Sequence, residues 1–399
     1  MVKLLVFVAI LWAASLAAGC NASKATAVDV PDADCPDDDC ADAGCDDDTD
    51  GDTDWDCPDP IAETCPNAVE PFPLMFEASE FGEGTRFVDV APWSVLAERD
   101  AGETRTISII GCAPWGDWSE GPCDATNARI ASLDVPVDSG LHAVAVAFGH
   151  FDLGTWSPSQ MAAVCGDAGC ALYGADLNAE PPEAELAPVP GGELPPTAAV
   201  HGLWRDQEDI LLCAYGDGIH CFDGAAWTSP QSASLEYPLF NDMETAYFDG
   251  SPGVVAVGDL GRIAYSGFPY WDGYWGTAYP DWYTVLPHDS FSGGYTVAGE
   301  GGVLGLANGD CAIADEDIVA LIDLGESGME WSTFATGGVT RSGRVFLNRE
   351  IVTGMSGSCY TGQVVGDDPR AVSFSCGIET NIFIAVEGAL YGTTDCAVD

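Results

Sequence analysis

The chain has 399 residues, of which 47% are hydrophobic, so it can bury a sizeable core. Its 64 acidic side chains outnumber 12 basic ones and give a formal charge of −52, which argues against nucleic acid as a partner because nucleic acid requires a basic footprint. Sixteen cysteines without paired CxxC zinc spacing indicate an oxidising compartment in which disulfides form.

Residues 1–19 are predicted to be a signal peptide. Lys3 supplies a positive start, and the apolar run from Leu4 to Ala18 is too short for a comfortable membrane span but typical of a signal sequence. The run ends in Leu16-Ala-Ala-Gly-Cys20, where small residues precede a cysteine. A plain cleaved signal peptide is one interpretation of this pattern.

The other interpretation is that the same residues resemble the lipobox of bacterial lipoproteins, with Ala17 at the position where leucine is commonest. The resemblance implies cleavage before Cys20, acylation of Cys20 and a membrane partner reached through that lipid anchor. Asn21 follows the cysteine, and by the same resemblance a residue other than aspartate there favours an outer-membrane lipoprotein, on either its periplasmic or its surface face.

Residues 20–67 form an acidic, cysteine-rich linker in which fifteen aspartates fall between Asp29 and Asp59. Apolar side chains are too few there to offset the entropy of ordering, so we expect a disordered tether. Asp46, Asp48 and Asp50 match the first half of a calcium-binding loop, but Cys57 stands where the loop requires a bidentate glutamate. The tether is therefore either a solvated spacer or a calcium site.

Six segments of the body share one pattern: an apolar run, a glycine-rich turn that usually carries an acid, and a second apolar run. The last glycines of these turns recur at spacings of 49, 43, 41, 41 and 45 residues, at Gly169, Gly218, Gly261, Gly302, Gly343 and Gly388. Apolar runs joined by Gly/Asp turns are β-hairpins, and this period is typical of propeller blades. We predict an all-β, six- or seven-bladed β-propeller whose repeated hairpins are strands two and three of each blade.

The first residues of the body can complete that ring in two ways. Residues 137–399 hold the recognisable blades, and residues 68–136 are expected either to close the propeller or to form an irregular blade. A closing strand removes the exposed edge of an incomplete last blade. The candidates for it are Thr85 to Val90 and Thr104 to Ile110.

Two stretches of the body carry a weak resemblance of their own. His201-Gly-Leu-Trp204 and Asp223-Gly-Ala-Ala-Trp227 resemble the blade repeats of bacterial secreted propeller proteins. The resemblance covers roughly Val137 to Cys396 and implies the propeller fold.

Cysteines flank two of the hairpin turns, and neighbours across a hairpin come within disulfide range. We predict the pairs Cys165–Cys170 and Cys213–Cys221, and a loop disulfide between Cys112 and Cys123.

Half of the residues from Phe268 to Tyr283 are aromatic, and glycines and prolines interrupt them, which predicts a loop between strands three and four. Such rings either stack on a ligand, a glycan or an envelope protein, or fill the space between blades. The candidate ligand-binding residues are Tyr270, Trp271, Tyr274, Trp275, Trp282 and Tyr283.

No catalytic residues are predicted, because the sequence holds no motif that joins a nucleophile or metal to its partners. The sequence therefore favours a non-enzymatic, envelope-anchored protein that presents its propeller as a binding or scaffolding surface. A hydrolase acting on polysaccharide, with carboxylates drawn from several blades, and a calcium-dependent adhesion module are the alternatives.

Overall fold

The structure is a computed structural model of the whole chain, which divides into two compact units, Met1–Thr53 and Asp54–Asp399. The residues that it describes all lie in the second unit. They are 60–62, 72–111, 125–154, 156–195, 199–205, 212–229, 239–248, 251–267, 270–274, 280–288, 294–306, 309–323, 336–348, 358–376 and 379–392.

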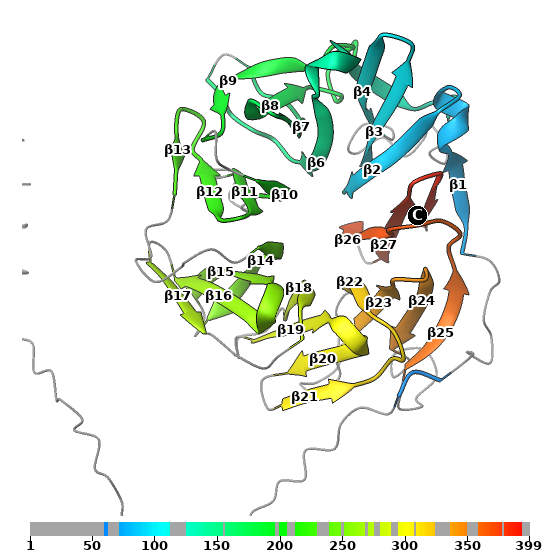
Figure 1. The fold of residues 1–399 in the computed structure, drawn as a ribbon, viewed down its shortest axis with the longest axis vertical. Helices are drawn as coiled ribbons and strands as arrows, with labels where there is room; N and C mark the ends of the chain where they lie inside the picture. Colours follow the sequence, from blue (N-terminus) through cyan, green and yellow to red (C-terminus); the bar gives the residue numbers. More distant parts are fainter. Residues whose placement is uncertain are drawn as a thin grey trace, which may run out of the picture. The chain divides into compact units, whose positions relative to one another are not determined.

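The second unit is a seven-bladed β-propeller, which confirms the predicted fold class. Seven four-stranded antiparallel sheets surround a common axis, and the first strand of each blade lies closest to it (Figure 1). Blades 1 to 3 are β2 (Thr85–Ala91), β3 (Ser94–Ala101), β4 (Thr104–Gly111) and β5 (Arg129–Pro136); β6 (His142–Phe148), β7 (Gln160–Gly166), β8 (Gly169–Ala175) and β9 (Ala187–Glu193); β10 (Val200–Arg205), β11 (Leu212–Gly216), β12 (Ile219–Phe222) and β13 (Trp227–Thr228).

The same inside-to-outside order continues through the C-terminal half. Blades 4 to 6 are β14 (Phe240–Phe248), β15 (Ser251–Gly258), β16 (Arg262–Gly267) and β17 (Tyr270–Tyr274); β18 (Trp282–His288), β19 (Gly294–Gly299), β20 (Val303–Leu306) and β21 (Gly309–Ala312); β22 (Ile318–Asp323), β23 (Thr336–Thr340), β24 (Arg344–Asn348) and β25 (Ser358–Gln363). Blade 7 holds β26 (Arg370–Cys376), β27 (Glu379–Val386) and β28 (Ala389–Gly392). Each of the six predicted hairpins is formed by strands two and three of a blade.

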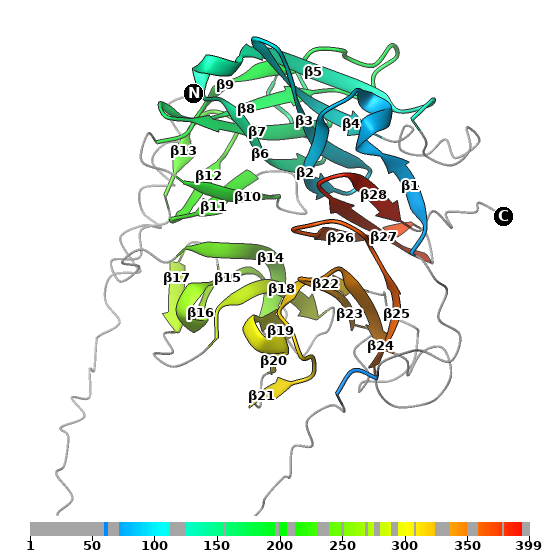
Figure 2. The same ribbon diagram turned by 45° about the vertical axis from the view of Figure 1, so that its right-hand side comes forward.

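The ring is closed by β1 (Leu74–Glu77), which pairs antiparallel with β28 as the fourth strand of blade 7. Neither expected closing strand has this role, because Thr85 to Val90 and Thr104 to Ile110 belong to β2 and β4 of blade 1. The N-terminal segment thus supplies both a closing strand and a whole blade. Figures 1 and 2 show β1 beside β28 at the outer edge of the ring.

The core lies between successive blades, because both faces of each sheet are apolar. One cluster joins blades 1 and 2 through Leu96, Ile109 and Val146, and another joins blades 7 and 1 through Phe76, Phe87 and Phe383. The described helices are short 3-10 turns, and none of them is long and apolar enough to span a membrane.

The glycine-acid pairs of the repeat are explained by a close backbone contact. A Cβ on Gly258 or Gly299 would lie 2.0 or 1.9 Å from the carbonyl oxygen of Leu239 or Asp281, just before the inner strand of the same blade. The following acid, Asp259 or Glu300, donates its backbone N–H to that same oxygen at 3.1 or 2.9 Å. Glycine is therefore required so that the turn can bind the start of the inner strand.

Residues 60–62 and 72–81 both lie at the outer edge of the ring, and we call these two segments the N-terminal belt (Figure 2). The N–H of Ile61 donates to Ile313 O after blade 5 at 2.8 Å, and the N–H of Tyr360 in blade 6 donates to Ala62 O at 3.1 Å. Ile61 is buried with residues of both blades. Phe72 packs in the cluster between blades 6 and 7, and β1 and η1 (Ala78–Phe81) follow.

Two predicted disulfides, Cys165–Cys170 and Cys213–Cys221, are confirmed across their hairpins. Cys311 and Cys359 each take part in a disulfide as well. The predicted partners Cys112 and Cys123 lie outside the described residues.

Candidate functional site

The inner strands share a one-residue shift in their pairing. In six blades, the pairing between the first and second strands skips one residue near the start of the first strand. The residue after the skip is Asp89, Ala145, Gly202, Asp242, Thr284 or Ala320. In blade 7 the equivalent residue is Arg370. It pairs with Ala385, which lies two residues before the turn between strands two and three, and Asp242 of blade 4 pairs in the same way with Val257. We call these seven residues the axial ring.

Polar members of the axial ring hold neighbouring blades together. Asp89 Oδ2 accepts the N–H of Val146 at 2.9 Å, and Asp242 Oδ2 accepts the N–H of Val285 at 2.9 Å. Thr284 Oγ1 accepts the N–H of Leu321 at 3.1 Å. In each case the donor directly follows the axial residue of the next blade, so one side chain satisfies a backbone group of the adjacent inner strand.

Two further groups share this level of the axis. A Cβ on Gly202 would lie 2.0 Å from the hydroxyl oxygen of Tyr215, so the phenol of Tyr215 occupies the space that glycine leaves. The side chain of Arg370 is 47% exposed, and its ion pair with Asp368 is long, at 3.4 Å. The axial site, defined as Asp89, Tyr215, Asp242 and Arg370, therefore combines two carboxyls, a phenol and a guanidinium.

The charges of the axial site act on one another. Burial raises the pKa of Asp89 to about 6, against the opposing effects of Arg370 and of hydrogen bonds from Val146 and Val90. Burial also raises the pKa of Asp242, although three hydrogen bonds and Arg370 oppose the shift. Burial, together with both carboxylates, raises the pKa of Tyr215 well above its ordinary value, so its hydroxyl stays neutral and can donate.

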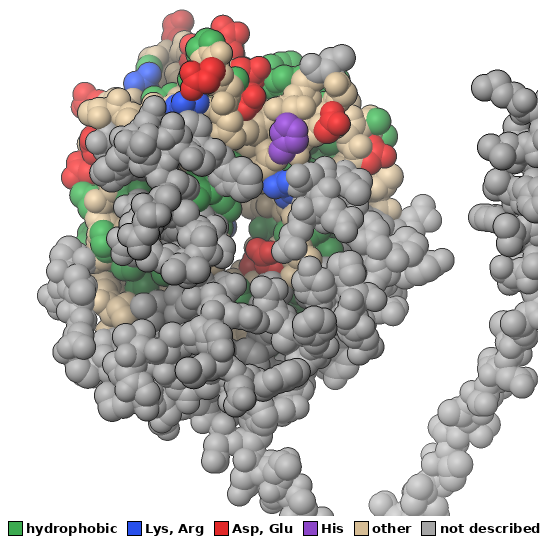
Figure 3. Space-filling model, turned by 180° about the vertical axis from the view of Figure 1, so that it is seen from behind, with side chains coloured by type: hydrophobic (Ala, Val, Ile, Leu, Met, Phe, Trp, Pro, Cys, Tyr) green, Lys and Arg blue, Asp and Glu red, His purple; other side chains and the backbone are tan. Residues whose placement is uncertain are grey.

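The body is hollowed near its middle in the space-filling view, and basic and acidic side chains border the hollow (Figure 3). A ligand that reached the axial site would meet two carboxyls with raised pKa values, whose ionisation the ligand can change, and the partly exposed guanidinium of Arg370. Carboxylates bind ammonium groups, and guanidinium binds carboxylate or phosphate. The arrangement therefore fits a small ligand that carries both a cationic and an anionic group.

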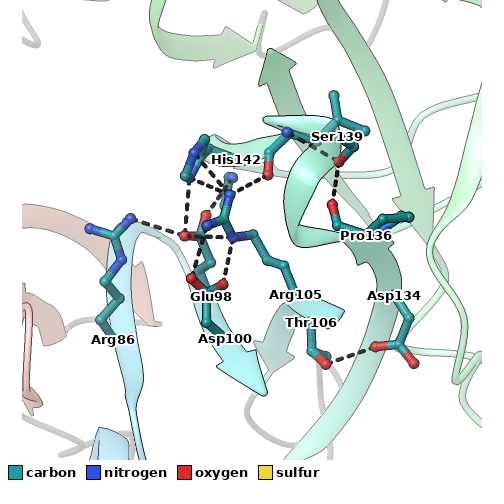
Figure 4. Close-up of polar contacts among 11 residues, drawn as sticks. Arg86, Glu98, Asp100, Arg105, Thr106, Asp134, Pro136, Ser139 and His142 are labelled. Carbon is teal, nitrogen blue, oxygen red and sulfur yellow. Dashed lines mark hydrogen bonds and ion pairs between the residues drawn. The ribbon is translucent and has the colours of Figure 1, made fainter. Parts of the chain in front are cut away.

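A second polar cluster connects blades 1 and 2 (Figure 4). Glu98, 3% exposed, accepts from Arg86 at 2.9 Å, from the backbone N–H of Ala143 at 3.0 Å and from His142 Nδ1 at 3.2 Å. Arg105 donates to both carboxylate oxygens of Asp100, at 2.7 and 2.9 Å, and to Leu141 O at 2.8 Å. We call this cluster the blade 1–2 latch.

Burial alone would raise the pKa of Glu98, but hydrogen bonds from Arg86, Ala143 and His142 outweigh it and hold the pKa below its ordinary value. The carboxylate is thus ionised, and both of its oxygens accept hydrogen bonds. These bonds join the sheets of blades 1 and 2.

The structure divides the predicted aromatic site. Tyr270, Trp271 and Tyr274 belong to β17, the outermost strand of blade 4, and not to a loop. Trp282 is 2% exposed and packs with Val255 and Val285 at the inner strand of blade 5. The residues from Tyr283 to His288 belong to that same inner strand, β18.

Tyr283 is half-buried and already has a cationic neighbour. The guanidinium of Arg341 lies 5.0 Å from the centre of its ring and pairs with Asp317 at 2.8 Å. Trp275 lies outside the described residues, as do Cys20 and the candidate calcium ligands Asp46, Asp48 and Asp50. Among the residues that the structure does describe, no cluster of three or more His, Cys, Asp or Glu side chains could hold a metal ion.

The axial site has no local signature in the sequence, because its four residues come from blades 1, 3, 4 and 7. Aligning the repeats on their inner strands would have placed Asp89 and Asp242 at equivalent positions. Nothing in the sequence indicates Tyr215, whose role depends on the missing side chain at Gly202. No protein-family model matches the chain, and no curated protein matches it.

Proposed function

We propose that the chain is an envelope lipoprotein, anchored through an acylated Cys20, whose propeller is a binding module with the axial site as its ligand site. The propeller fold suggests a binding or scaffolding surface. The observation that supports a ligand site most directly is the axial site itself, where two carboxyls, a phenol and a half-exposed guanidinium from four blades lie close enough to shift one another's pKa.

The ligand that fits this site is a small zwitterion. An ammonium group would pair with Asp89 and Asp242 and favour their ionised forms, and a carboxylate would pair with Arg370. The formal charge of −52 also attracts the cationic end of such a ligand.

Calorimetry with the full chain tests the site, with L-alanine and L-lysine as zwitterions and putrescine and acetate as ligands with only one kind of charge. We expect a zwitterion to bind more tightly than either single-charge ligand. Asp242→Asn and Arg370→Gln should each weaken zwitterion binding about tenfold or more, since each removes one charged hydrogen-bond partner.

The matched control is Asp138→Asn, which removes one exposed carboxylate elsewhere on the propeller. It should leave binding unchanged. If no zwitterion binds the wild type, or if the two axial variants bind as well as the control, the axial site is not the ligand site.

The anchor is tested separately by fractionating cells that express wild type or Cys20→Ser. The wild type should sediment with outer membranes and gain the mass of its acyl chains, while the variant should be recovered in soluble form. Equal membrane recovery of both proteins would exclude lipid anchoring through Cys20.

Hydrolysis of polysaccharide is the second candidate function, favoured by the pKa of Asp89, which at about 6 suits a general acid. A reducing-sugar assay that detects activity in the wild type and none in Asp89→Asn would support it.

Calcium binding by the tether through Asp46, Asp48 and Asp50 is a further proposal. Calorimetry with Ca²⁺ on the wild type and on the triple Asp→Asn variant tests it.

A further inference from the structure

A cavity of about 340 Å³ lies on the outer half of blade 1, where η1 faces the sheet. Its volume is at the lower end of the range of roughly 300–1,000 Å³ that is typical of small-molecule sites. The residues that line it include Phe81, Thr85, Arg99, Ser108, Ile130 and Ser132. It is separate from the axial site, since the two have no residue in common.

Strand register explains why a cavity forms here. One row across the sheet runs from Phe87 to Ala97, Ser108 and Ser132. The inner part of this row, Phe87 and Ala97, is buried against blade 7. The outer part is hydroxylated and only partly buried, so the face changes from apolar core to polar wall along a single row.

The polar wall offers hydroxyl and guanidinium groups. Ser108 and Ser132 hydrogen-bond each other at 2.8 Å, so each retains capacity for a further partner. Arg99 is fixed beside the cavity by donating to Phe81 O at 3.1 Å. The hydroxyl of Thr85 is buried without a hydrogen-bond partner among the described residues.

The apolar wall is formed by Phe81, Ile110 and Ile130. Ile130 is 40% exposed, an unusual position for a large apolar side chain of a strand. Phe81 is held by edge-on contacts with Phe76 and Phe87, at 5.1 and 6.4 Å between ring centres. The apolar side of the cavity is therefore rigid and faces the hydroxyl groups.

The charges of the lining nearly cancel. Glu80 and Arg99 have opposite signs, and Glu98 is neutralised by Arg86 and Arg105 in the latch. A charged ligand would therefore gain little from this lining. Hydroxyls that both donate and accept, opposite an apolar surface, match a molecule with hydroxyls on its edge and C–H groups on its face.

We infer that this cavity is a binding site for a neutral saccharide of one or two rings, with its hydroxyls toward Thr85, Ser108 and Ser132 and its apolar face toward Phe81 and Ile130. The site would give the propeller a second ligand, independent of the axial site. The Thr85 hydroxyl, which has no partner among the residues that the structure describes, would gain one when the sugar binds.

Saturation-transfer NMR with the full chain tests the inference, using glucose, galactose, mannose and N-acetylglucosamine, with acetate and inorganic phosphate as charged comparisons. We expect at least one sugar to bind, and we expect neither charged probe to displace it. Ser108→Ala/Ser132→Ala and Ile130→Trp, which fills the cavity, should each weaken sugar binding about tenfold or more.

Thr85→Val separates a binding role from a structural one. Because the hydroxyl has no hydrogen-bond partner among the described residues, the variant should melt at the same or a higher temperature and yet bind sugar more weakly. Thr104→Val is the matched control, because it removes an exposed hydroxyl outside the cavity and should change neither property.

The inference is overturned if a folded wild type binds no sugar, or if binding persists unchanged in the cavity variants. Arg370→Gln distinguishes the two sites, since it should reduce zwitterion binding and leave sugar binding intact. Loss of sugar binding in Arg370→Gln, with cavity variants unaffected, would place the sugar at the axial site and overturn the assignment to blade 1.

Discussion

At the scale of single residues, Asp89 shows how one carboxyl can join two blades at a cost that depends on pH. Its oxygen accepts the N–H of Val146, but burial raises its pKa to about 6. Between the unfolded value of about 3.9 and 6, the folded protein binds the proton more tightly than the unfolded chain does. The contribution of Asp89 to stability therefore falls as pH rises through this window, by at most about 3 kcal/mol.

Asp89→Asn should keep the hydrogen bond and remove this pH dependence. We expect the variant to be more stable than wild type at pH 7 and nearly equal to it at pH 4. Urea unfolding at both pH values measures the difference. A variant less stable than wild type at pH 7 would show that the ionised carboxylate is favourable in the fold.

The glycines before the turn acids give a second residue-scale prediction. Gly258→Ala should destabilise the fold by about 2 kcal/mol or more, because the new Cβ would lie 2.0 Å from Leu239 O. Gly388→Ala is the matched control, since nothing lies within 4 Å of its Cβ. Equal melting temperatures for the two variants would contradict the close-contact explanation.

At the scale of elements, β1 is short, but it carries Phe76, which is 1% exposed between blades 7 and 1. Phe76→Ala should cost about 3–5 kcal/mol, in the range for truncation of a buried aromatic side chain. Leu74→Ala, in the same strand but 51% exposed, should cost less than about 0.5 kcal/mol. Denaturant unfolding compares them, and similar losses would mean that β1 does not hold the ring closed.

The blade 1–2 latch has the opposite pH behaviour to Asp89. The pKa of Glu98 is lowered, so its stabilising contribution is complete above its ordinary pKa and is lost as pH falls through the folded value. Glu98→Gln should cost about 2 kcal/mol or more at pH 7, because Arg86 and Arg105 lose a buried partner, and the loss should shrink in acid. Asp100→Asn, at the exposed end of the latch, should cost less, and chemical unfolding at two pH values tests both variants.

At the scale of the whole molecule, the propeller was predictable because its hairpins repeat, and the repeat exists for a steric reason at glycines such as Gly258. Blade 1 was not recognised as a repeat, because its second turn, Ala101-Gly102-Glu103, is flanked by the charged residues Arg99, Asp100 and Arg105 and not by apolar runs. The closing strand could not be predicted, because four residues that follow a tether carry no periodic signal.

The candidate sites were harder to predict than the fold. Trp282 is a residue type that often stacks on ligands, but here it lies in the core. Aromatic side chains serve equally well in ligand sites and in cores, so the sequence alone does not distinguish the two. The axial site depends on register across four blades, and the cavity of blade 1 depends on where blade 7 stops covering its neighbour. Neither property is encoded in a local stretch of sequence.

The N-terminal belt has a mechanical consequence if the chain is tethered. Tension transmitted along the chain toward residue 60 would first meet the two hydrogen bonds and the buried Ile61 that fasten Pro60–Ala62 to blades 5 and 6. The strand that closes the ring lies further along the chain, beyond that attachment. A force strong enough to detach Ile61 would release Pro60–Ala62 from blades 5 and 6 while β1 stayed paired with β28. The propeller would therefore lose this peripheral attachment before its ring opened.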